Sequence, residues 1–112
     1  MKHLTIKSQE EKNAIANAIA GKLRTRLNNT FGEICKVESV ELSEETTHVI
    51  VTELHHGMTF AVSDTIREVT RQYENQYGTG VITYLDTRNF IYNNSDVFGT
   101  EIVVVVLVRA YI

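Results

Sequence analysis

The C-terminal segment constrains the fold of this 112-residue chain most, because it reads as a β-strand that is apolar on both sides. We predict a strand from Glu101 to Ile112, in which alternate residues point to opposite faces. One face carries Ile102, Val104, Val106 and Val108, and the other carries Val103, Val105 and Leu107. A sheet in a small two-layer domain normally keeps one face in water. Either this strand is central and enclosed or another subunit covers it, and we expect an oligomer.

The N-terminal part of the chain predicts an amphipathic helix from Ser8 to about Asn29. The residues Ser8-Gln9-Glu10-Glu11 have the form of a capping box, in which the serine hydroxyl accepts a hydrogen bond from the Glu11 amide. Apolar residues then recur at steps of three and four, which places them mostly on one helix face. Gly32 is a suitable stop for this helix.

The rest of the chain predicts strands over 34–42, 47–54 and 81–85 and a second helix that ends at Gly78. The segment from Met58 to Val62 is a short strand, with Ser63-Asp64 as the N-cap and first turn of the helix, or else the helix already opens at Thr59. The element order is therefore α-β-β-(β)-α-β-β. We predict a single α+β domain over residues 1–112, with two amphipathic helices packed on an antiparallel sheet.

Composition narrows the class of protein. Hydrophobic residues make up 43% and charged residues 22% of the chain, which excludes intrinsic disorder. The single cysteine rules out an intramolecular disulfide, and the N-terminus lacks the apolar core of a signal peptide. The longest apolar run, 102–108, is far shorter than the roughly 18 residues that span a bilayer. We expect a cytoplasmic protein with no membrane partner.

Charge and motifs argue against several activities. The net charge is -3, and acidic residues gather between Glu38 and Glu53, so we expect no general nucleic-acid binding. Nothing in the spacing brings Cys35 to a histidine, and the adjacent pair His55-His56 is a poor metal site because neighbours on a strand diverge. No phosphate-binding glycine motif opens a helix. We therefore predict no catalytic residues, no metal and no cofactor.

The strongest binding candidate is the segment Thr87–Asn94, which combines a cation, aromatic rings and amides in a stretch that otherwise looks like a loop. Its candidate ligand-binding residues are Arg88, Phe90, Tyr92 and Asn93, and Arg109 in the last strand joins them. Aromatic rings stack on bases, and arginine pairs with phosphate. The alternatives are a flap whose rings pack on the core and an arginine that reaches water at a strand end.

Four features carry a resemblance to a known family: the capped helix from Ser8, the segment Leu54–Thr59 before the second helix, the Phe90 segment, and Arg109. With its size and element order, the chain resembles the small phage anti-Thoeris proteins, which sequester cyclic ADP-ribose isomers. The resemblance implies dimers or larger oligomers, with ligand pockets of aromatic and arginine side chains at subunit interfaces. No functional residue is transferred from it.

The resulting hypothesis is a non-enzymatic, phage-type binding protein that sequesters a nucleotide-derived immune signal and so blocks host anti-phage defence. The signal would be a cyclic ADP-ribose isomer or a cyclic oligonucleotide, captured in the host cytoplasm. Phe90 or Tyr92 would stack on the base, Arg88 and Arg109 would neutralise phosphates, and Asn93 would bond to ribose. The alternatives are a protein–protein inhibitor of a host defence complex, similar to an anti-CRISPR protein and acting through the acidic stretch Glu38–Glu53, and an oligomeric structural subunit.

Overall fold

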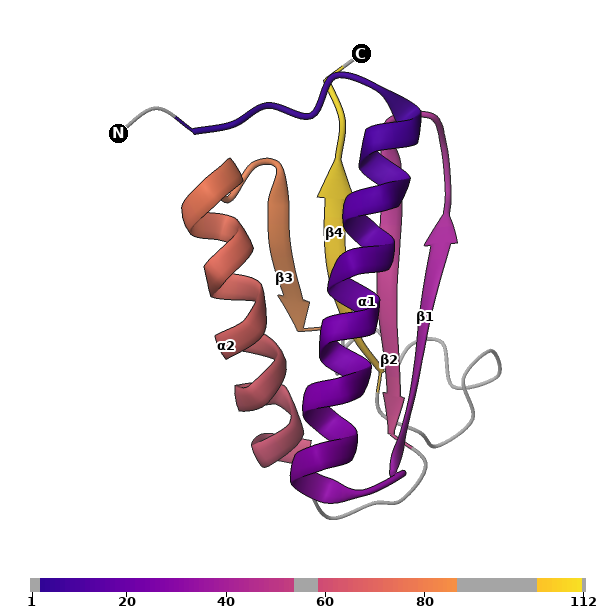
Figure 1. The fold of residues 1–112 in the computed structure, drawn as a ribbon, viewed down its shortest axis with the longest axis vertical. Coiled ribbons are helices and arrows are strands. Elements are labelled where there is room, and N and C mark those ends of the chain that lie inside the picture. The colour runs from indigo at the N-terminus through magenta and orange to yellow at the C-terminus, as the bar shows by residue number, and fades with distance from the viewer. Residues whose placement is uncertain (1–2, 54–58, 87–102, 112) are drawn as a thin grey trace.

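The computed structural model describes residues 3–53, 59–86 and 103–111, and it has an α+β fold (Figure 1). Along the chain the elements are α1 (Gln9–Phe31), β1 (Cys35–Glu41), β2 (Thr46–Glu53), α2 (Thr59–Tyr77), β3 (Ile82–Asp86) and β4 (Val103–Arg109). The four strands form one antiparallel sheet in the order β1-β2-β4-β3. Both helices lie on the same face of this sheet (Figure 1). The predicted α+β class, with two helices and an antiparallel sheet, is confirmed.

Helix α1 begins and ends as its sequence predicts. The Ser8 hydroxyl accepts a hydrogen bond from the Glu11 amide at 3.1 Å, and Gly32 adopts a φ of 80° just after the helix. Glycine reaches that left-handed region without a steric penalty. The buried stripe faces the sheet and consists of Ala16, Ile19, Ala20, Leu23 and Leu27.

Helix α2 begins at Thr59, so the alternative of a short strand over 58–62 is wrong for residues 59–62. The helical spacing of the buried residues explains why the helix begins there. Val62 is buried together with Ile66 and Val69, and spacings of three and four residues place all three on one helix face. No described helix is long and apolar enough to cross a membrane.

Strand β4 is central, as its apolar sequence allows. It pairs with β2 on one side and with β3 on the other, and Val106 and Val108 are fully buried under the helices. The predicted strand was longer than the observed one, and residues 101, 102 and 112 lie outside the described residues. The helices cover the face of β4 that carries Val106 and Val108. This accounts for one of the two apolar faces of the strand.

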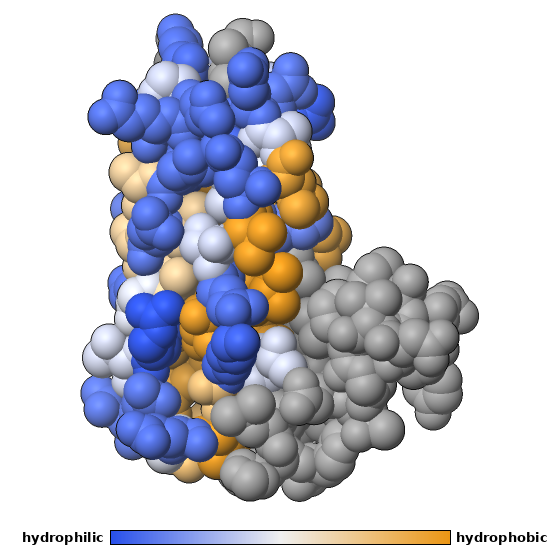
Figure 2. All heavy atoms as spheres, turned by 90° about the vertical axis from the view of Figure 1, so that its right-hand side faces the viewer, coloured by the Kyte–Doolittle hydropathy of each residue, from blue (hydrophilic) through white to orange (hydrophobic). Residues whose placement is uncertain are grey.

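The second face of the sheet, which we call the open face, has no helix over it among the described elements (Figure 1). One row of paired residues crosses all four strands on this face: Val40, His48, Leu107 and Thr83. Three of these side chains are half-buried and Val40 is exposed. Figure 2 shows hydrophobic side chains reaching the surface on the side where β1 lies, in keeping with the exposure of Val40 and Leu42.

Candidate ligand-binding site

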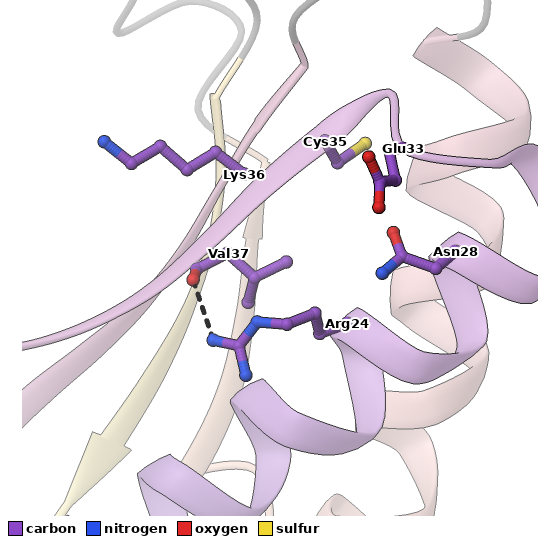
Figure 3. A pocket seen from close by; sticks show the side chains of 6 residues that line it. All are labelled: Arg24, Asn28, Glu33, Cys35, Lys36 and Val37. Carbon is purple, nitrogen blue, oxygen red and sulfur yellow. Dashed lines mark hydrogen bonds between the residues drawn. The ribbon is translucent and has the colours of Figure 1, made fainter.

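A hollow of about 390 Å³ lies between the C-terminal half of α1 and the start of β1 (Figure 3). Six residues line it: Arg24, Asn28, Glu33, Cys35, Lys36 and Val37. The local fold explains how they meet. Arg24 and Asn28 are one helical turn apart on α1, and the turn at Gly32 reverses the chain, so that β1 passes back along the helix.

Arg24 is fixed within this hollow. Its Nη2 donates a hydrogen bond to the Val37 carbonyl oxygen at 2.9 Å (Figure 3). That carbonyl belongs to β1, which is the outer strand of the sheet, so the arginine covers part of an exposed strand edge. A guanidinium carries several N–H donors in a planar fork. The bond to Val37 positions this cation and leaves further donors for an anion.

The remaining lining residues differ in where they point (Figure 3). The side chains of Asn28 and Glu33 are directed toward each other, with the Cys35 thiol beside them. Lys36 extends to the other side of β1 and forms an ion pair with Glu38 at 3.1 Å. The hollow thus combines one well-placed cation with an amide and a carboxylate. Such a set suits a ligand that carries an anionic group next to hydroxyls.

Of the candidate residues from the sequence, Arg88, Phe90, Tyr92 and Asn93 lie outside the described residues. Arg109 is described. It is exposed at the C-terminal end of β4, and its guanidinium carbon lies 5.2 Å from the centre of the Tyr111 ring. An exposed arginine at a strand end can reach water and can also bind an anion, so phosphate binding by Arg109 stays a prediction.

The position of Arg109 relative to the predicted binding segment follows from the strand directions. Residues 87–102 connect Asp86 at the end of β3 to Val103 at the start of β4. Arg109 is at the opposite end of β4, about 20 Å away at roughly 3.3 Å per residue. The structure therefore separates Arg109 from both attachment points of that segment.

Sequence reasoning missed Arg24, Asn28 and Glu33. The signal was present in the one-turn spacing of Arg24 and Asn28 and in the glycine turn that follows them. In the sequence, however, charged and amide residues on a helix are typical of a solvated face. What gives them a shared hollow is the path of β1 after Gly32, which the spacing alone does not reveal.

Cys35 is half-buried, and its geometry with His48 does not form a catalytic pair. Cys35 pairs across the sheet with Glu53, whereas His48 is five residues further along β2. A side chain five positions away also points to the other face. His55 and His56 lie outside the described residues. Within the described residues there is no group of three or more potential metal ligands.

The described carboxylates of the acidic stretch are exposed, and two of them have partners within the fold. Glu41 Oε2 accepts hydrogen bonds from Asn13 Nδ2 at 2.6 Å, Gln9 Nε2 at 2.9 Å and Lys12 Nζ at 3.1 Å. These bonds, that of Asn13 foremost, lower the pKa of Glu41 to about 2. Glu38 forms an ion pair with Lys36. Glu44 and Glu45 are exposed at the turn between β1 and β2, where they can form the predicted acidic surface. The alternative of an inhibitor that acts through this stretch stays a prediction that depends on Glu44 and Glu45.

Glu41 gives a pH dependence with a defined sign. A carboxyl with a lowered pKa stabilises the fold above its unfolded pKa of about 4.3, and that stability is lost as the pH falls toward 2. We expect Glu41→Gln to flatten the decline in melting temperature between about pH 4.5 and 2. Thermal unfolding across this range checks the prediction, with Glu44→Gln at the exposed turn as the control. Parallel declines in wild type and Glu41→Gln would contradict it.

No known protein family matches the chain, and neither a curated protein nor a solved structure matches it.

Proposed function

We propose that this chain is a non-enzymatic binding protein that sequesters a nucleotide-derived signalling molecule. A cyclic ADP-ribose isomer or a cyclic oligonucleotide combines anionic phosphates with ribose hydroxyls. The observation that carries the proposal is the hollow at Arg24, where a positioned guanidinium lies near the Asn28 amide and the Glu33 carboxylate. Arginine pairs with phosphate, and amides and carboxylates bond to hydroxyls. Tight capture of this kind requires no bond-breaking chemistry.

The sequence-based part of the proposal concerns the base and the biological role. Phe90 or Tyr92 is the predicted stacking partner, Arg88 and Arg109 the predicted phosphate partners, and Asn93 the predicted ribose partner. Together with the resemblance to anti-Thoeris sponges, these residues support a role in blocking host anti-phage defence. That role places the protein in the cytoplasm of the host cell.

The working unit in this proposal is a homo-oligomer, in which a second copy covers the open face. The row Val40–His48–Leu107 and the neighbouring Ile50 present an apolar surface in the middle of that face. Burial lowers the pKa of His48 below its usual value, so its ring is uncharged at neutral pH and suits an apolar contact. A self-complementary sheet face favours a symmetric pair.

A ligand panel tests the binding function. We expect cyclic ADP-ribose isomers or cyclic oligonucleotides to raise the melting temperature by roughly 5 °C at ten times the Kd, because native-state ligands stabilise. Arg24→Gln should remove this shift if the phosphate binds in the hollow, and Arg109→Gln should remove it if the phosphate binds at β4. Arg26→Gln is the matched control, since Arg26 bonds to Glu68 on α2 instead. A panel with no shift in the wild type would refute the proposed function.

A further inference from the structure

Two hydroxyl groups, one on α2 and one on β3, have no hydrogen-bond partner among the described residues. They are Ser63 Oγ on α2 and Tyr84 Oη on β3, and both atoms are shielded from solvent. Ser63 is only 6% exposed. Buried polar groups are almost always paired, so an unpaired one marks the position of a missing partner. Helix α2 and strand β3 pack against each other, and we call the boundary between them the seam.

Arg67 is the cationic side chain nearest to both residues in the chain's layout, one turn from Ser63 on α2 and against the Tyr84 ring. It follows Ser63 by one helical turn on α2, so the two side chains are neighbours on one face. Its guanidinium carbon lies 4.9 Å from the centre of the Tyr84 ring. Arg67 itself is exposed, and no carboxylate of the described residues forms an ion pair with it. Within the part of the chain that the structure describes, the seam therefore has a guanidinium without a carboxylate partner and two hydroxyls without a hydrogen-bond partner, all able to donate.

We propose that the seam formed by Ser63, Arg67 and Tyr84 binds an oxyanion, namely the phosphate group of a small molecule. Phosphate oxygens accept hydrogen bonds from hydroxyls and from the planar guanidinium fork. Because Arg67 lies over the tyrosine ring and reaches solvent, its long side chain can turn to admit the anion to the hydroxyls. This site is at the β3 edge of the sheet, whereas the hollow at Arg24 is at the β1 edge, so the two are independent.

Isothermal titration with inorganic phosphate tests this site. We expect saturable binding to the wild type and at least a roughly tenfold weaker Kd for Tyr84→Phe and for Arg67→Gln, since each removes a bond to a charged group. Arg71→Gln is the matched control, because Arg71 carries the same charge one turn further along α2. In an Arg24→Gln background, which removes the cation of the proposed ligand hollow, Tyr84→Phe and Arg67→Gln should weaken phosphate binding by the same factor, and this separates the seam from the hollow.

The same variants give a second readout without phosphate. Removing a buried hydroxyl that has no partner costs nothing, so Tyr84→Phe and Ser63→Ala should melt at or above the wild-type temperature. A lower melting temperature for both variants would mean that the hydroxyls already have partners, and it would overturn the proposal. Absence of phosphate binding to the wild type, or equal affinity in Tyr84→Phe and Arg67→Gln, would overturn it as well.

Discussion

Lys12→Met is expected to lower the free energy of unfolding by about 3 kcal/mol. The Lys12 side chain is fully buried, and its ammonium donates to the Ser43 carbonyl at 2.6 Å, the Glu44 carbonyl at 2.9 Å and Glu41 Oε2 at 3.1 Å. These bonds fasten the turn between β1 and β2 to the first turn of α1. Methionine would fill a similar volume but would leave both turn carbonyls without this donor.

Urea denaturation measures this loss directly. Lys7→Met is the matched control, because Lys7 is exposed just before the same helix, and it should change stability by less than about 0.5 kcal/mol. A loss below about 1 kcal/mol for Lys12→Met would show that water replaces the ammonium at the turn carbonyls. The turn would then not depend on this buried cation.

The second large effect concerns the open face, where His48→Glu should convert the proposed oligomer into monomers. His48 lies between Val40 and Leu107 in the row that crosses the sheet. In a symmetric pair the substitution would bury a carboxylate from each copy in an apolar contact, and unpaired buried charge is costly. In the separated monomer the same carboxylate would reach water, so the fold should persist.

Size-exclusion chromatography with light scattering measures this change in mass. Thr25→Glu is the matched control, since it introduces the same charge at an exposed position on α1. We expect that control to keep the wild-type mass. An unchanged mass for His48→Glu would show that the subunits do not meet at the open face, and it would contradict the proposed interface.

Much of the fold was predictable because local signals and the final topology agree. The capping box at Ser8 and the glycine at 32 bounded α1. The apolar run of the last strand predicted either a central strand or one covered by another subunit, and the sheet order shows that β4 is central. The start of α2 was ambiguous between strand and helix. The segment 58–62 is too short for its residue pattern to distinguish a strand from a helix. In the structure, burial of Val62 together with Ile66 fits the helix that begins at Thr59.

The sites were less predictable because they depend on which elements become neighbours. Arg24 and Glu33 are nine positions apart and share a hollow because β1 returns along α1. Lys12 reads as a surface lysine in the helix pattern, yet it is buried against a turn about thirty residues away. Arg109 was a candidate because it interrupts an apolar strand, and it lies at the opposite end of β4 from Val103, where the segment that contains Arg88 joins the strand.

Native mass spectrometry of the protein purified from cells that make the signalling nucleotide tests the central claim most directly. It reports the number of subunits and any small molecule that they retain. The proposed function predicts an oligomer that carries an intact nucleotide-derived ligand, which is released unchanged when the protein is denatured. A monomer with no retained mass, or a bound product of a broken nucleotide, would contradict it.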